Sequence, residues 1–335
     1  MDAGHRKVLR LILQGGSVID WRRLHFRDVA EVDAFLRLHL FDLGDPRDEK
    51  RLRAILGQAV EYLRTAYGYR VAAAVATPDD LRTLFLLASG TAEPSRYRRI
   101  ACVVLKVMHV IHHLEARELL FRTPMREADL AERVERRVMS VAREMEGAGL
   151  PIVQFQGNRK SRGSLVTKLL VKRESVAAQV FDRLRYRVLT RGAPDVAPVL
   201  HHLARRLFPF NYVVPGQSEN TLLPSRTSRT VNQGPDNPFS GDAYRALHFV
   251  VDLPVRIDDV LPPAPPAEGD DLGCIVFSMV EFQVMDEEAA RQNEVGPASH
   301  HRYKRRQAVA ALRRLSRGLV VPRRKKAREK GEREP

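Results

Sequence analysis

The chain has 335 residues, of which 44% are hydrophobic and 29% are charged, and its formal net charge at pH 7 is +15. This composition is that of a globular protein, and the length predicts two domains, or one domain with a long helical extension. The first residues are too charged for a signal peptide, and no apolar run approaches the ~18 residues of a membrane span. Cys102 and Cys274 lie in apolar runs without metal-ligand spacing, which predicts buried, reduced thiols. We therefore expect a cytoplasmic protein with no membrane partner.

The positive charge is concentrated near the C-terminus. Residues 301–335 contain fourteen lysines and arginines and three glutamates, a net charge of +11. Such a segment is typical of proteins with a polyanionic partner, although a solvated basic tail that orders nothing has the same composition. Residues 319–335 are expected to form a basic, disordered tail.

Residues 1–149 are predicted to form a helical domain. Apolar residues recur at helical spacing in two stretches, and Thr77-Pro78 supplies an N-cap followed by a first-turn proline. The last helix is expected to end at Gly147 or Gly149. The apolar positions of the two stretches are Leu52, Ile55, Leu56, Ala59, Val60, Leu63, Leu130, Val134, Val138, Val141 and Met145.

From residue 150 onward the pattern changes to β-rich runs separated by helical ones. Two polar stretches, residues 215–243 and 262–271, are expected to be loops. The prediction is an α+β fold, in which a mixed β-sheet flanked by helices occupies a domain of residues 150–318 behind the helical domain. Strands are expected at 151–156, 181–190, 211–214, 247–255 and 275–284, and helices at 165–172, 194–208 and 299–317.

Two carboxylates interrupt the apolar strands of this second domain. Alternation along residues 277–285 places Glu281 on the face opposite the apolar one, and Asp182 interrupts the strand expected at 181–190. Two carboxylates on neighbouring strands suit a hard divalent cation such as Mg²⁺, and their repulsion without the metal predicts that Glu281→Gln stabilises the fold. The alternative is structural: arginines close to Asp182 would pair with the acids, and neutralisation would then destabilise the protein.

The segment from Gly157 to Ser164 is a glycine-bounded, basic stretch that leads from a strand into a helix. Its backbone amides, Ser164 and its basic side chains are expected to cradle a triphosphate. It is not a Walker A loop, because the glycine, lysine and hydroxyl spacing of that motif is missing.

A group of histidines in the first half is a weaker candidate for a metal site. His109, His112, His113 and Glu115 lie within two helical turns, but the apolar helix around them offers no clear third ligand. The pattern favours core histidines.

Six short motifs follow one another in the second half of the chain, and from Glu281 to Lys304 their spacing is that of a known family without a gap. In this order they resemble the synthetase domain of RelA/SpoT-type alarmone synthetases, over roughly residues 150–306. The histidine-aspartate pair of that family's hydrolase domain does not occur in the first half, so alarmone degradation is not expected. The motifs are Lys160 with Ser164, Asp182 with Arg187, Tyr244 with His248, Glu281 with Gln283, Glu294 with Gly296, and His300 with Tyr303 and Lys304.

The resemblance implies a nucleotidyltransferase fold and a Mg²⁺-dependent pyrophosphokinase that transfers the β,γ-pyrophosphate of ATP to a ribose 3′-hydroxyl. Asp182 and Glu281 match the family's metal ligands, and Glu281 also matches the group that draws a proton from the attacking hydroxyl. The acceptor would be GDP or GTP, which gives (p)ppGpp as in the stringent response. It would otherwise be the 3′ end of tRNA, as in the toxic small synthetases, which would better explain the basic C-terminus.

The resemblance also assigns two sets of binding residues. Tyr244 matches a tyrosine that stacks on the acceptor base, a role that needs only an exposed π-face. The residues matched to the acceptor side are Tyr244, His248, Gln283 and His300. The residues matched to ATP are Lys160, Ser164, Arg187 and Arg159.

This chain departs from the family on the ATP side. Glu219 and Ser240 stand where the family has two phosphate-contacting lysines, and Arg226 or Arg229 would have to replace them. The competing prediction is therefore a catalytically degenerate synthetase fold that binds nucleotide or RNA and signals through the helical half. A second copy of the chain or a regulatory protein is then a further candidate partner.

Overall fold

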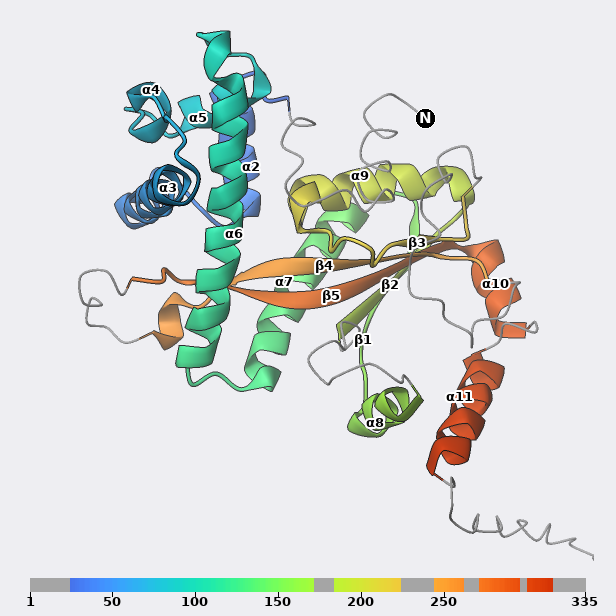
Figure 1. The fold of residues 1–335 in the computed structure, drawn as a ribbon. Helices are drawn as coiled ribbons and strands as arrows, with labels where there is room; N and C mark the ends of the chain where they lie inside the picture. Colours follow the sequence, from blue (N-terminus) through green and yellow to red (C-terminus); the bar gives the residue numbers. More distant parts are fainter. Residues whose placement is uncertain (1–24, 172–183, 224–243, 262–270, 296–299, 316–335) are drawn as a thin grey trace, which may run out of the picture.

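The structure is a computed structural model that describes residues 25–171, 184–223, 244–261, 271–295 and 300–315 (Figure 1). Several residues singled out in the sequence lie outside these ranges, as does the basic segment 319–335. Within the described ranges, no helix combines the length and the apolar character needed to cross a membrane. The singled-out residues outside the description are Asp182, Arg226, Arg229, Ser240 and Gly296.

The described part of the first half is helical, as the sequence predicts. Helix α3 begins after Asp45, whose side chain accepts a hydrogen bond from the backbone N–H of Arg47 at 2.9 Å. It ends at Gly68, which adopts the left-handed conformation with a φ of 67°. The helices are α2 (Val29–Leu38), α3 (Pro46–Tyr67), α4 (Ala73–Ala76), α5 (Arg82–Ser89), α6 (Arg98–Arg122) and α7 (Glu127–Gly147).

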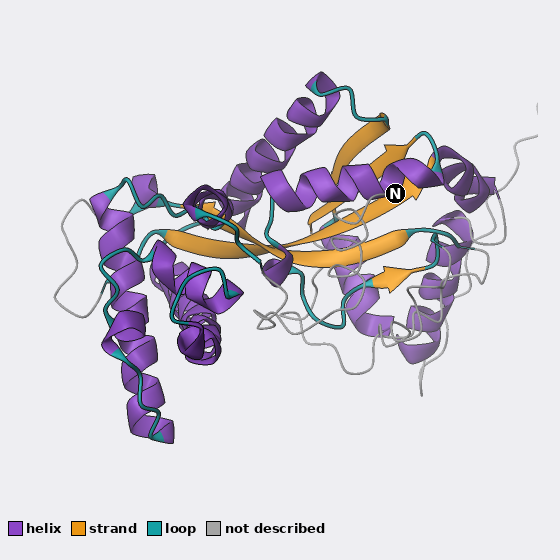
Figure 2. Cartoon of the chain, turned by 90° about the horizontal axis from the view of Figure 1, so that it is seen from above, coloured by secondary structure: helices purple, strands orange, loops and turns teal. Residues whose placement is uncertain are grey.

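The second half contains a five-stranded mixed sheet with the strand order β1-β2-β5-β4-β3. Strands β2 and β5 are parallel and the other neighbours are antiparallel. The predicted α+β fold, a mixed sheet flanked by helices, is confirmed (Figure 2). The elements are β1 (Ile152–Arg159), α8 (Arg162–Val171), β2 (Leu184–Thr190), α9 (Val196–Arg206), β3 (Glu219–Asn220), β4 (Leu247–Arg256), β5 (Ile275–Asp286), α10 (Glu287–Val295) and α11 (His300–Leu315).

One face of the sheet forms the main hydrophobic core. Val280, Phe282 and Val284 of β5 are fully buried and pack with side chains of α7 and α9. The alternation predicted for this strand is therefore confirmed. The opposite face carries Glu281, so the core side of the strand determines which way this carboxylate points.

A second cluster of buried side chains lies among α2 to α6 and includes Ile275 of β5. Helix α7 belongs to the sheet's core rather than to this cluster, since Val134, Val138 and Met145 are buried against it. The division of the chain at residue 150 stays a prediction. The boundary between the two clusters of buried side chains lies instead within α6, which contributes residues to both. In Figure 1, α6 crosses the ends of β4 and β5 that lie farthest from α10.

Several local expectations differ from the structure. Strand β3 (Glu219–Asn220) lies inside the stretch 215–243 that was expected to be a loop, and Thr77 ends α4 rather than capping the next helix. Residues 211–214 do not form a strand; only Val213 makes an isolated bridge, to Val251. The reason is that Asn211 and Tyr212 are both buried against α6, whereas strand residues alternate between two faces. Cys102 is a buried thiol as predicted, but Cys274 is half-buried.

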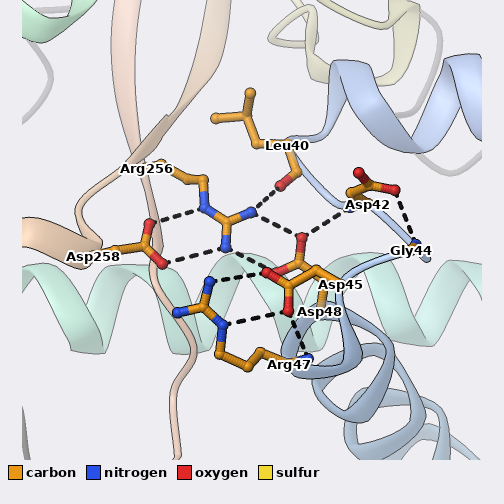
Figure 3. Close-up of polar contacts among 8 residues, drawn as sticks. All are labelled: Leu40, Asp42, Gly44, Asp45, Arg47, Asp48, Arg256 and Asp258. Carbon is orange, nitrogen blue, oxygen red and sulfur yellow. Dashed lines mark hydrogen bonds and ion pairs between the residues drawn. The ribbon is translucent and has the colours of Figure 1, made fainter.

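An ion-pair cluster ties the helical half to the end of β4 (Figure 3). Asp48 of α3 is almost fully buried, and its two carboxylate oxygens accept hydrogen bonds from Arg256 at 2.8 and 2.9 Å. Arg256 also donates to the backbone oxygen of Leu40 and to Asp258. Asp48 accepts a further bond from the backbone N–H of Asp42. The buried carboxylate is thereby fully paired.

Removing the charge of Asp48 should destabilise the protein strongly. Asp48→Asn leaves the Arg256 guanidinium without its buried partner, and breaking such a pair lowers the free energy of unfolding by about 3–5 kcal/mol. Arg47→Ala is the matched control, because its pair with Asp45 is on the surface and is worth at most about 1 kcal/mol. Denaturant unfolding measures both, and equal losses in the two variants would show that this cluster does not hold the halves together.

Candidate active site

A row of polar side chains crosses the face of the sheet opposite the core. The strand register aligns one residue from each of the five strands, and every member of this row is polar. A shorter row beside it aligns Asn158, Arg185 and Glu281. The five-strand row is Gln156, Arg187, Gln283, His248 and Glu219. Polar residues so arranged on a sheet face are a candidate binding site.

Glu281 is the most enclosed acid of this face, with 8% of its surface exposed. Its Oε2 accepts a hydrogen bond from Arg185 Nε at 2.7 Å, and its Oε1 accepts one from His248 Nδ1 at 3.1 Å. Burial acts to raise the pKa of Glu281, but the charge of Arg185 and the hydrogen bond from His248 outweigh it, so the pKa lies well below its usual range. Glu281 is therefore a buried, fully ionised carboxylate.

Gln283 and Tyr244 also lie close to His248, and the Gln283 amide nitrogen is 3.4 Å from the same Nδ1 that contacts Glu281. The Gln283 amide nitrogen lies 3.5 Å from His248 Nε2, and the Tyr244 and His248 rings are 5.6 Å apart. Burial raises the pKa of Tyr244 to about 12, so the phenol stays uncharged at neutral pH. The structure thus brings together four of the residues predicted from the sequence, namely Glu281, Gln283, His248 and Tyr244.

Arg187 lies on the same face, next to Gln283. It pairs loosely with Glu294 at 3.4 Å and contacts the sulfur of Met285. Its Nε is buried and has no hydrogen-bond partner within the described part of the chain. A buried donor of this kind is costly unless a ligand or water satisfies it.

The basic segment expected to cradle a phosphate has a different shape. Strand β1 continues through Gly157 to Arg159 and α8 begins at Arg162, so only a two-residue turn, which contains Lys160, separates them. Gly157 is required because a Cβ there would meet the ring of Tyr186 at 2.9 Å, not because a phosphate approaches it. A cradle of loop amides is therefore not formed.

The remaining residues assigned to ATP divide between two places. Ser164 lies in the first turn of α8, with its Oγ 3.0 Å from Ser161 Oγ. Arg159 pairs with Leu184, and this register places it on the face of the sheet opposite Glu281. Lys160 and Ser164, at the end of β1, remain candidates for a phosphate contact.

The metal ligands can be examined in part. Glu281 is described and Asp182 lies outside the described ranges. The side chain of His300, which was matched to the acceptor, also lies outside the description, at the start of α11. Across the described residues, no group of three or more His, Cys, Asp or Glu side chains is arranged to hold a metal ion. This also applies to His109, His112 and His113, which pack in the interface between α6 and the sheet. A cation at Glu281 would need a second acidic ligand.

Comparisons with known proteins extend these observations. No protein-family model matches the sequence, and no curated protein matches it either. Among solved structures, the small alarmone synthetase 1 from Bacillus subtilis bound to its product pppGpp is similar, with 16% identity and a TM-score of 0.35, over 56% of this chain and 87% of that chain. A GTP pyrophosphokinase family protein from Streptococcus pneumoniae is similar with 15% identity and a TM-score of 0.33, over 56% and 84%.

A third similar structure is the small alarmone synthetase 2 from Bacillus subtilis, with 16% identity and a TM-score of 0.29, over 52% of this chain and 80% of that chain.

The polar face also includes residues that the motifs do not, namely Gln156, Asn158, Arg185 and Glu219. Arg185 contacts Glu281 directly, and Glu219 is aligned with His248 across β3 and β4. Alternation along β2 is sufficient to place Arg185 on the same face of the strand as Arg187. Its partner could not be read from the sequence, because the register between β2 and β5 is a tertiary property.

The same face continues toward α6. Asp252 of β4 is aligned with Met279, two residues from Glu281 along β5, and lies 3.6 Å from His113 Nε2 of α6. The His113 ring stacks on Phe277 at 4.2 Å. Burial lowers the pKa of His113, so this histidine gives Asp252 no positive partner at neutral pH.

Replacing Glu281 should destabilise the metal-free protein. The ion pair with Arg185 contradicts the expectation that Glu281→Gln stabilises it, because the variant leaves a half-buried guanidinium without its anion. We expect a loss of about 2–4 kcal/mol in the free energy of unfolding. Glu288→Gln, which removes an exposed carboxylate of α10, should cost less than about 1 kcal/mol. Denaturant unfolding in EDTA compares them, and an increase in stability for Glu281→Gln would contradict the ion pair.

Asp252 should make stability depend on pH. Burial raises its pKa to about 7, against the opposing charge of Arg117, while an unfolded aspartate titrates near about 3.9. From about pH 4 to 7 the folded protein thus keeps a proton that the unfolded chain has lost, so the stability contribution of Asp252 falls as pH rises.

Asp252→Asn removes this penalty. The difference in free energy of unfolding between the variant and wild type should therefore shift in favour of the variant by about 1–3 kcal/mol between pH 4 and pH 8. This free-energy difference is smaller than the pKa shift of Asp252 alone would give, because about a fifth of the side chain is exposed to water. Asp79→Asn, at an exposed position, should show no such shift. Thermal melts across this pH range give the measurement, and parallel curves for wild type and Asp252→Asn would rule the effect out.

Proposed function

We propose that the chain is a metal-dependent pyrophosphokinase that transfers pyrophosphate from ATP to the ribose 3′-hydroxyl of a guanine nucleotide or of a tRNA 3′ end. The observation that carries the proposal is the buried, ionised Glu281 beside a row of polar residues, bonded to His248 and two residues from Gln283. Phosphoryl transfer rests mainly on positioning and charge neutralisation, and a sheet-borne array of this kind supplies both.

The reaction assigns roles to residues on this face. The 3′-oxygen of the acceptor attacks the β-phosphorus of ATP, the bond from that phosphorus to the α,β-bridging oxygen breaks, and AMP leaves with that oxygen. Glu281 takes the hydroxyl proton, and Arg187, whose Nε has no hydrogen-bond partner among the described residues, binds phosphate oxygens. Tyr244 stacks on the acceptor base beside His248.

Mg²⁺ fits Glu281 by chemistry, since carboxylate oxygens are its preferred protein ligands. Both oxygens of Glu281 already accept hydrogen bonds, so metal binding requires one of them to be released. We propose Asp182 as the second ligand. The metal would neutralise charge that develops on the transferred phosphates.

The charge of two helices favours tRNA as the acceptor. Neither α8 (Arg162–Val171) nor α11 (His300–Leu315) contains an acidic residue, and Lys304, Arg305 and Arg313 are exposed. The helices pack together, and Arg314 Nη1 donates to the backbone oxygen of Leu170 at 2.8 Å. An acid-free basic surface is suited to a nucleic-acid backbone.

A degenerate, non-catalytic nucleotide-binding protein is the second candidate. Two observations favour it: Arg185 already neutralises Glu281, and Glu219 places a negative charge beside His248 where a phosphate-binding residue would be expected. In that case the polar face would bind nucleotide or RNA without transfer.

Incubation with γ-labelled ATP and Mg²⁺, in the presence of GDP, GTP or total tRNA, tests the proposal. Label should pass to one acceptor, and Glu281→Gln should lower the rate by at least about 100-fold, which is the contribution of a general base. Glu288→Gln is the control and should retain the wild-type rate. Nucleotide binding by wild type without label transfer to any acceptor would favour the degenerate protein.

A further inference from the structure

Arg185 is directly opposite Glu281 in the parallel β2–β5 pair. Its Nε lies 2.7 Å from Glu281 Oε2, and the two side chains are 27% and 11% exposed. The contact is therefore largely enclosed, and at this distance a guanidinium and a carboxylate attract each other strongly. The other oxygen of Glu281 is bonded to His248 Nδ1. Glu281 has no carboxylate oxygen that is free of a protein donor.

A divalent cation bound to Glu281 would compete with this guanidinium for the same carboxylate. Mg²⁺ binds a carboxylate oxygen at roughly 2.0–2.1 Å and demands near-octahedral geometry, so a cation on Oε2 would crowd the donor that Arg185 Nε places there. The two are also like charges, so they repel across a site with little water to screen them. A cation at Oε2 would therefore weaken the contact of Arg185 with Glu281, and Arg185 opposes the binding of the cation.

We infer that Arg185 is the resting counter-ion of Glu281, and that a divalent cation reaches Glu281 only by displacing it. The inference rests on the proposed function, in which Glu281 is a metal ligand. It goes further by naming Arg185 as the positioning residue that opposes the metal and holds the carboxylate in the metal-free protein.

The surroundings of Arg185 show where its side chain can go. Its neighbours on the same face are Asn158 of β1 and, two residues along β2, Arg187. Both are on the side of Glu281 away from His248 and β4. Phosphate oxygens bound at Arg187 would offer Arg185 a new anionic partner. Binding of the donor phosphates and release of Glu281 for the cation are then one event.

Direct metal binding without nucleotide tests the inference. Wild type and Arg185→Gln are titrated with Mn²⁺, and free Mn²⁺ is followed by electron paramagnetic resonance. Arg185→Gln should bind Mn²⁺ at least about tenfold more tightly, because a neighbouring positive charge has been removed. Arg185→Lys keeps the charge and should stay close to wild type. Arg191→Gln, which removes the same charge at an exposed position just after β2, is the matched control and should not differ from wild type.

A second readout guards against misfolding. Arg185→Gln should melt earlier than wild type in EDTA, and Mn²⁺ should raise its melting temperature more than it raises that of wild type. The double variant with Glu281→Gln should lose the tight Mn²⁺ site.

Three results would overturn the inference: unchanged Mn²⁺ affinity in Arg185→Gln, weaker affinity, or no Mn²⁺ binding in any variant. If Arg185→Gln binds Mn²⁺ more tightly while wild type transfers no pyrophosphate, the proposed activity fails and the role of Arg185 stands. If wild type is active and the affinity is unchanged, only the role of Arg185 fails.

Discussion

The negative charge of Glu281 in the middle of a sheet is the constraint on which the polar face depends. A carboxylate enclosed to this degree is tolerated only with donors or cations in contact. The donors come from both neighbouring strands, Arg185 from β2 and His248 from β4. A slip of one residue in either strand would turn these partners to the core face and leave Glu281 unpaired. The charge thus specifies the register of the three central strands, in addition to any chemistry it performs.

Hydrophobic periodicity was sufficient to predict the helical character of the first half, the helices α8, α9 and α11, the strands β1, β2, β4 and β5 and the face on which Glu281 lies. These features are local: the pattern of apolar residues determines which side of a strand is buried. The partner of Glu281 is not local. Arg185 lies 96 residues earlier in the chain, and the sequence places several arginines near Asp182 without distinguishing which one meets an acid. Only the parallel pairing of β2 with β5 makes that choice.

Glycine and histidine residues show a second limit of sequence reasoning. A glycine between a strand and basic residues suggests close approach of a phosphate, yet Gly157 makes room for the ring of Tyr186. Three histidines near one another suggest a metal, yet burial lowers the pKa of His109, His112 and His113, which lie against aromatic rings. In both cases the residue type indicated a special position, but the group that it contacts is determined by the tertiary structure. Burial and packing then decided the role.

The helical half and the candidate site share one face of the β4–β5 pair. Ile275, Phe277 and Asp252 on this face contact the helices, while His248 belongs to the polar row and Glu281 to the shorter row beside it. Asp252 and His248 are four residues apart on β4, roughly 13 Å at ~3.3 Å per residue. A shift of α6 against β4 would therefore act on the strand that supplies the hydrogen bond to Glu281 Oε1. Because α6 is held to this strand pair by stacking of His113 on Phe277, and the strand end by the Asp48–Arg256 pair, such a shift has to break enclosed contacts. The helices consequently hold β4 in the register that keeps His248 on Glu281.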